Sequence, residues 1–124
     1  MKNIVLIIAF FLTTLITYSQ TDKSKLGFEN AKQELESVLN NESSKQILVD
    51  MVIKSQATAI KYAETILFDI YGQKNIEKQK PYEIFEIDGY WIIEGKLPNG
   101  MIGGTFNIIF NSKNGQIIKL THGK

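Results

Sequence analysis

The sequence contains no cysteine among its 124 residues. Disulfide bonds, thiolate metal sites and cysteine nucleophiles are therefore excluded, and so is a lipid anchor attached to a cysteine. A secreted domain without disulfides must be held together by its hydrophobic core alone.

Arginine is also absent, and all fourteen basic residues are lysines, which stand against thirteen acidic residues. Arginine is the usual bidentate partner of phosphate groups and of guanine, so its absence argues against nucleic-acid binding. The single histidine, His122, cannot form a histidine metal cluster by itself. We therefore expect no metal, no other cofactor and no nucleic-acid partner.

Residues 1–19 have the layout of a secretory signal peptide. Lys2 supplies a positive charge, Ile4 to Leu12 is an unbroken apolar run, and Thr13 to Ser19 is small and polar. Small residues stand at the third and first positions before Gln20, as signal peptidase prefers. A chain that starts at Gln20 would be secreted, with the periplasm as the expected location and no integral membrane span. A retained membrane anchor is the alternative.

The rest of the chain is expected to divide into two parts. Residues 20–45 are read as a polar leader with an amphipathic helix, and residues 46–124 as a helix-plus-sheet domain. The second part opens with Ile47–Ile53, an apolar run that fits either a strand or a short helix.

Within the first part, Leu35, Val38 and Leu39 have helical spacing. This spacing predicts an amphipathic helix over residues 29–40. Residues 21–28 before it are expected to be a mobile leader.

A second helix is predicted over residues 56–71. Ser55 is a suitable N-cap, and Gly72 is the residue type that most easily closes a helix. The apolar residues between them recur at three- and four-residue steps: Ala59, Ile60, Ala63, Ile66, Leu67 and Ile70. Residues 73–80 are expected to be a polar connection.

The last third of the chain alternates between apolar and polar residues and predicts four strands. They are expected at residues 82–87, 90–97, 104–110 and 116–121. Asp88–Gly89 and Asn114–Gly115 stand between strands and suit the turns of β-hairpins.

Side-chain alternation gives the sheet one apolar face and one mixed face. The apolar face is expected to carry Phe85, Ile87, Trp91, Ile93, Leu97, Phe106, Ile108, Phe110, Ile118 and Leu120. The mixed face is expected to carry Tyr82, Tyr90, Ile92, Glu94, Asn107, Ile109 and Lys119. A helix that covers one face only produces this pattern. The predicted fold class is α+β, with helices packed on a curved four-stranded antiparallel sheet.

An ordered set of short motifs runs through this region: Thr58-Ala59, Tyr71-Gly72, Pro81-Tyr82, Trp91 with Gly95 and Leu97, Gly103-Gly104-Thr105-Phe106, and His122-Gly123-Lys124. With these motifs, the segment from Val52 to Lys124 resembles the immunity-protein branch of the nuclear transport factor 2-like fold, which is cystatin-like in shape. Members of that branch protect bacteria against toxins made by their own kind. The resemblance implies a helix across a cone-shaped sheet and a function of binding and blocking a toxin. It supplies no catalytic residues.

A few single residues of the second part are candidates for a chemical role. His122 could act as a base, but a structural or partner-contact role is the simpler interpretation. Glu94 could lie in an apolar pocket, where a raised pKa would let it act as a base. The simpler interpretation is a solvated charge on the face of the sheet. Gly100, Gly103 and Gly104 fit no phosphate-binding motif and are expected to form a bend before the third strand.

The leading hypothesis is therefore a non-enzymatic inhibitor that covers the active site of a protein toxin. The expected partner-binding residues are Tyr82, Tyr90, Ile92, Glu94, Asn107, Lys119 and His122. The first alternative is a small-ligand-binding protein with a pocket lined by Phe85, Trp91 and Phe106. The second is an isomerase- or hydrolase-like enzyme, which would need an acid inside that pocket.

Overall fold

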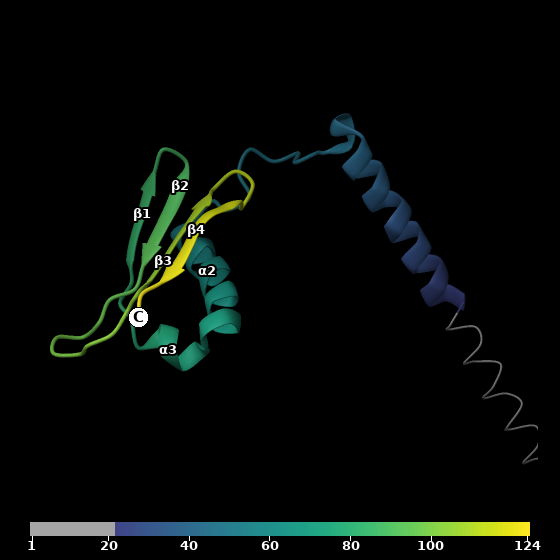
Figure 1. Ribbon diagram of the computed structural model, residues 1–124. Coiled ribbons are helices and arrows are strands. Elements are labelled where there is room, and N and C mark those ends of the chain that lie inside the picture. The colour runs from purple at the N-terminus through teal and green to yellow at the C-terminus, as the bar shows by residue number, and fades with distance from the viewer. Residues whose placement is uncertain (1–21) are drawn as a thin grey trace, which may run out of the picture. The chain divides into compact units, whose positions relative to one another are not determined.

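The computed structural model describes residues 22–124 (Figure 1). The predicted signal peptide, residues 1–19, lies outside this range. The chain divides into one unit that ends at Gln46 and a second unit that spans Ile47–Lys124. No helix within residues 22–124 has both the length and the apolar character needed to cross a bilayer.

In the first unit, residues 22–40 are helical. The helix predicted over residues 29–40 is confirmed, but the mobile leader expected before it is wrong, because residues 22–28 continue the same helix. That stretch contains no proline, and its one poor helix former, Gly27, costs only about 1 kcal/mol relative to alanine. Lys32 and Glu36 add an ion pair one turn apart, at 3.9 Å.

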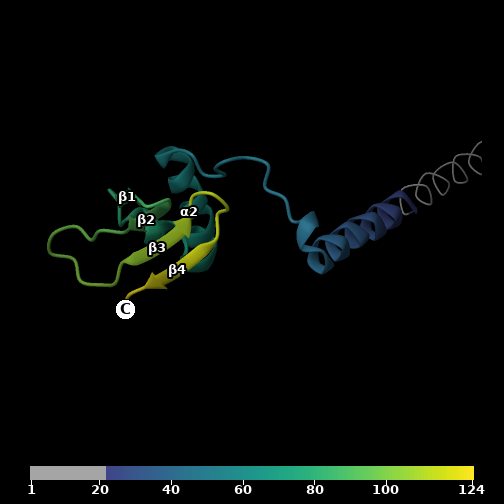
Figure 2. The same ribbon diagram turned by 90° about the horizontal axis from the view of Figure 1, so that it is seen from above.

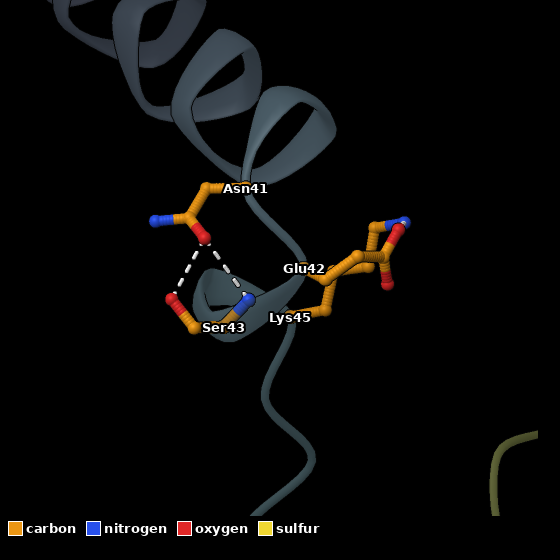
Figure 3. Close-up of polar contacts among 4 residues, drawn as sticks. All are labelled: Asn41, Glu42, Ser43 and Lys45. Atoms are coloured by element: carbon orange, nitrogen blue, oxygen red, sulfur yellow. Dashed lines mark hydrogen bonds and ion pairs between the residues drawn. The ribbon is translucent and has the colours of Figure 1, made fainter.

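A short 3₁₀ helix, η1 (Glu42–Ser44), follows (Figure 3). Asn41 caps it, since its side-chain oxygen accepts hydrogen bonds from the Ser43 backbone N–H at 3.1 Å and from the Ser43 hydroxyl at 2.7 Å. Lys45 forms an ion pair with Glu42. Residues 42–44 therefore form a single capped helical turn.

The second unit begins with an irregular segment, which α2 (Gln56–Tyr71) follows. The predicted caps are both present. The Ser55 hydroxyl accepts from the Thr58 N–H at 3.2 Å, and Gly72 ends the helix with a φ of 85°. The small residues Ala59 and Ala63 are buried, and they let the helix approach the sheet closely.

The sequence predicted a polar connection over residues 73–80, and this prediction is wrong. These residues contain α3 (Gln73–Glu77), a helix of little more than one turn. Its single apolar residue, Ile76, is completely buried, and so is the polar Gln79 that follows it. One buried apolar residue gives no periodic pattern, so the polar sequence conceals this helix.

The sheet is antiparallel in the order β1-β2-β3-β4. Its strands are β1 (Glu83–Ile87), β2 (Tyr90–Glu94), β3 (Phe106–Asn111) and β4 (Ile117–His122). The helices α2 and α3 lie on one side of it (Figures 1 and 2). The predicted α+β fold class is confirmed.

Both predicted hairpin turns are present. Asp88 and Gly89 have φ values of 50° and 80°, the left-handed pair that suits a two-residue hairpin. The second turn is longer, with Gly115 at a φ of 75° and its N–H donating to the Asn111 carbonyl at 2.8 Å.

The core lies between α2, α3 and the inner face of the sheet. Five residues of the two central strands are almost fully buried there: Trp91, Ile93, Phe106, Ile108 and Phe110. Burial of a large apolar side chain stabilises a fold by roughly 1.5–3 kcal/mol, so this cluster is a main source of stability.

The segment Ile47–Ile53 is neither of the predicted alternatives, a strand or a helix. It is irregular, with bends at Val49, Asp50 and Val52. The backbone N–H groups of Val52 and Ile53 donate to the Ser112 carbonyl at 3.1 and 2.9 Å. The Ile53 carbonyl accepts from the Trp91 indole at 3.1 Å. These bonds fix only the end of the segment, while Ile47, Leu48 and Val49 remain exposed.

Strand β1 and the first two residues of β4 present faces opposite to those predicted, whereas Lys119 and Leu120 are placed as expected. In β1, Ile84 pairs with the buried Ile93, which turns Phe85 and Ile87 to the other side of the sheet. In β4, a bulge between Ile109 and Phe110 of β3 shifts the register. Ile117 therefore packs on the core, and Ile118 is exposed.

Candidate functional site

The face of the sheet turned away from α2 and α3 is the candidate site, and we term it the outer face. Strand pairing arranges its residues in three cross-strand rows. The rows are Glu83-Glu94-Asn107-Thr121, Phe85-Ile92-Ile109-Lys119 and Ile87-Tyr90-Asn111.

The middle of the outer face is apolar. Phe85, Ile92 and Ile109 are neighbours across three strands, and the row ends at Lys119. Phe85 keeps 49% of its surface exposed and Ile87 keeps 55%. Ile92 and Ile109 are half-buried. Together these side chains form an apolar patch of the kind that can mark a binding surface.

One end of the outer face is acidic. Glu83 and Glu94 stand directly opposite each other, an arrangement that is unfavourable unless each charge has a partner. Lys96 lies 2.6 Å from Glu83, and the side-chain amide of Asn107 donates to Glu94. Glu94 takes part in none of the ion pairs found within residues 22–124.

Five of the seven residues predicted to bind a partner lie together on this face: Tyr90, Ile92, Glu94, Asn107 and Lys119. The other two, Tyr82 and His122, do not. Both are on the helix-facing side, where α2 and α3 reach the ends of the strands.

Tyr82 packs its ring edge-to-face on Phe106, with 5.1 Å between the ring centroids. Its hydroxyl donates to Glu64 of α2 at 3.0 Å, and Lys80 pairs with the same carboxylate at 2.7 Å. The prediction that Tyr82 belongs to the mixed face is therefore wrong. Its side chain ties β1 to α2.

Burial raises the pKa of Tyr82, and the hydrogen bond to Glu64 and the negative charges of Glu64 and Glu77 raise it further. Because the folded state holds this proton more tightly, stability is lost as the pH rises above about 10, the pKa of an unfolded tyrosine. We expect the Tyr82→Phe variant to lose less stability than the wild type at alkaline pH. Urea unfolding at pH 9 and pH 11 measures the free energy of unfolding of both proteins. An equal decrease in the wild type and in the variant would contradict the raised pKa of Tyr82.

His122 belongs to a polar cluster that the sequence did not predict. The Gln79 side-chain oxygen accepts from the Phe106 N–H at 2.9 Å, so its NH₂ group donates to the Asn75 carbonyl and to His122 Nε2, each at 3.1 Å. His122 also stacks on Tyr71, with 4.9 Å between ring centroids. This cluster fastens α3 to the end of β4.

Glu94 and His122, the acid and the base that the sequence suggested, are not brought together. Glu94 lies on the outer face, whereas His122, opposite Phe106 in the register, lies on the inner side. The sheet therefore separates the two groups. Within residues 22–124, no cluster of histidine or acidic side chains is arranged to hold a metal ion.

The ligand pocket predicted from Phe85, Trp91 and Phe106 is also not formed, because Phe85 is on the opposite face from the other two. A different hollow of about 560 Å³ opens at the surface beside the start of α2. Its lining residues are Gln56, Ile60, Lys80, Pro81, Tyr82 and Ile84. It is open to solvent rather than enclosed between helix and sheet.

Comparison with known proteins places this architecture in a family. The sequence profile of the NTF2 fold immunity proteins matches residues 58–124, from the first turn of α2 to the last residue. The chain belongs to this family. Membership supports a role in toxin immunity, and the resemblance expected from the sequence motifs is confirmed.

Two curated relatives come from Escherichia coli K12, and both are uncharacterised. YhhH is 30% identical over 119 residues, which are 95% of this chain and 86% of YhhH. YbbC is 39% identical over 77 residues, which are 61% of this chain and 63% of YbbC. No solved structure matches.

Proposed function

We propose that this NTF2 fold immunity protein binds a protein toxin through its outer face and inhibits the toxin by covering its active site. The protein acts as a binding partner and not as an enzyme. Family membership supports the toxin-immunity role, and the outer face supports the choice of surface.

The observation that carries the proposal is the apolar middle of the outer face. In most sheets of this size, a face with several isoleucines and a phenylalanine is covered, but neither α2 nor α3 covers this one (Figure 2). Protein interfaces combine an apolar centre with a polar rim. Here Phe85, Ile92 and Ile109 form the centre, while Glu94 and Lys119 stand in the rim.

The two rim charges have opposite signs and stand at separate points of the outer face. Glu94 is in the first row, and Lys119 ends the second row on the edge strand β4. Opposite charges at separate points fix the orientation of a partner and speed its approach more than they raise its affinity. A toxin that fits this face would present a basic group to Glu94 and an acidic group to Lys119.

We also propose that the protein works outside the cytoplasm, with the periplasm as its location. The support is the signal-peptide pattern of residues 1–19, which predicts export and cleavage before Gln20. Immunity at this location would require that the toxin be met as it enters the cell.

Growth rescue tests the proposed surface. The chain is co-expressed with a candidate toxin from a neighbouring reading frame, and Tyr90→Ala is combined with Lys119→Glu to alter the outer face. We expect this double variant to lose protection, whereas Lys61→Glu, an exposed charge reversal on α2, should protect like the wild type. If the double variant folds and still protects fully, the outer face is not the binding surface.

A further inference from the structure

The connection between β2 and β3, residues 95–105, projects beyond the sheet in both views (Figures 1 and 2). Its tip is apolar and exposed. Met101 keeps 50% of its surface exposed, and Ile102 is fully exposed. No charged residue occurs from Leu97 to Thr105. A branched apolar side chain displayed in this way contributes nothing to the core of its own unit.

The tip has a defined turn. The Met101 N–H donates to the Pro98 carbonyl at 3.1 Å, and Gly100 between them has a φ of 85°. These are the features of a type II turn, which requires a positive φ at its third residue. The turn places Met101 and Ile102 immediately after it, at the far end of the loop.

The base of the loop is fastened on both sides. The Lys96 N–H donates to the Gln79 carbonyl at 2.8 Å, and the Lys96 side chain pairs with Glu83. On the return side, Gly104 packs directly against Gly123, and the Gly123 N–H donates to the Thr105 carbonyl at 3.0 Å. An apolar tip on a fastened base loses little conformational entropy when a partner binds it.

We infer that this loop is a second contact element, which inserts Ile102 and Met101 into an apolar cleft of the toxin. The inference rests on the proposed function. The loop joins the two central strands at the end where Glu94 and Asn107 lie, so its base adjoins the first row of the outer face. Buried apolar anchors that fill pockets carry a large share of the energy of an interface.

The charge around the loop favours a protein over a membrane as the partner. Membrane-inserting segments combine apolar residues with lysines that face anionic lipids and with aromatic residues at the interface. Residues 97–105 contain neither lysine nor an aromatic residue. Glu94, which directly precedes the loop, takes part in no ion pair within residues 22–124, and anionic lipid would repel it.

The test uses the full-length chain and a purified candidate toxin from a neighbouring reading frame. Ile102→Asn is compared with Ile70→Asn, the same change at an isoleucine of α2 that is 54% exposed. We expect Ile102→Asn to raise the Kd about 30-fold, as for an interface hot spot, and Ile70→Asn to leave it unchanged. Both positions are exposed, so the melting temperatures should match the wild type.

The outcomes separate this inference from the proposed function. If Ile102→Asn binds like the wild type while the Tyr90→Ala, Lys119→Glu variant does not, the loop inference is overturned and the outer face stands. If the wild-type chain does not bind the toxin at all, the loop inference and the proposed function are both wrong. If the wild type binds phosphatidylglycerol vesicles and Ile102→Asn does not, the loop is a membrane element and the inference is wrong.

Discussion

Gly104→Ala is expected to destabilise the domain by about 3 kcal/mol, near the upper range for overpacking. A Cβ at this position would overlap the carbonyl group and the Cα of Gly123. Both sides of this contact are backbone, so no side chain can move away to make room. The end of β4 would have to separate from the start of β3. Urea unfolding followed by the fluorescence of the buried Trp91 measures the loss.

Gly27→Ala is the matched control, because nothing lies within 4 Å of a Cβ built at Gly27 and the residue is helical. It should leave the unfolding of the unit Ile47–Lys124 unchanged. A Gly104→Ala protein as stable as this control would show that the two glycine backbones are not in contact.

Gln79→Leu is expected to cost about 3 kcal/mol, although leucine is apolar and similar in size. Gln79 is fully buried. Its side-chain oxygen accepts a hydrogen bond from the Phe106 N–H, and its NH₂ group donates to the Asn75 carbonyl and to His122. Each buried polar group left without a partner costs roughly 1–3 kcal/mol. Leucine would fill the space but leave these groups unpaired.

Gln73→Leu provides the comparison, since Gln73 is exposed and its side chain bonds only to Glu77 at 3.0 Å. Its stability should stay within about 0.5 kcal/mol of the wild type. Hydrogen exchange adds a specific signal, because the Phe106 amide should lose protection in Gln79→Leu alone. Unchanged protection there would refute the hydrogen bond to Gln79.

The sequence predicted the parts of the fold that depend on local patterns. Helix α2 has both of its caps and a periodic apolar stripe, and Asp88–Gly89 fits only a tight turn. The prediction failed where a distant partner decides the outcome. In β1, Ile84 competes with Phe85 and Ile87, and only pairing with Ile93 selects the inner residue.

The bulge in the β3–β4 pair is a second case. Alternation along β4 places Ile118 with Leu120, but the register shift at Ile109 and Phe110 brings Ile117 to the core instead. One unpaired residue reverses the face of everything before it, and the sequence of β4 contains no signal for it.

The part of the candidate site that lies on β2 was predictable, whereas Phe85 of β1 and the residues at the strand ends were not. Tyr90, Ile92 and Glu94 alternate regularly with Trp91 and Ile93, so their common face follows from the strand alone. Tyr82 and His122 lie at strand ends, where α2 and α3 supply hydrogen-bond partners from elsewhere in the chain.

Gln79 was missed for a related reason. It stands in a polar stretch, where nothing in the sequence separates a buried glutamine from a solvated one. Its burial depends on Phe106 and His122, which follow it by 27 and 43 positions. A contact of this range leaves no local pattern in the sequence.

Methyl NMR of the complex tests the central claim most directly, because the two central strands carry isoleucines in adjacent pairs. Ile92 and Ile109 are on the outer face, whereas their neighbours Ile93 and Ile108 are completely buried on the inner side. When the toxin is added to isoleucine-labelled protein, the methyl signals of Ile92 and Ile109 should shift strongly and those of Ile93 and Ile108 only slightly. Large shifts confined to the inner pair, or to isoleucines of α2 such as Ile70, would show that the toxin binds elsewhere.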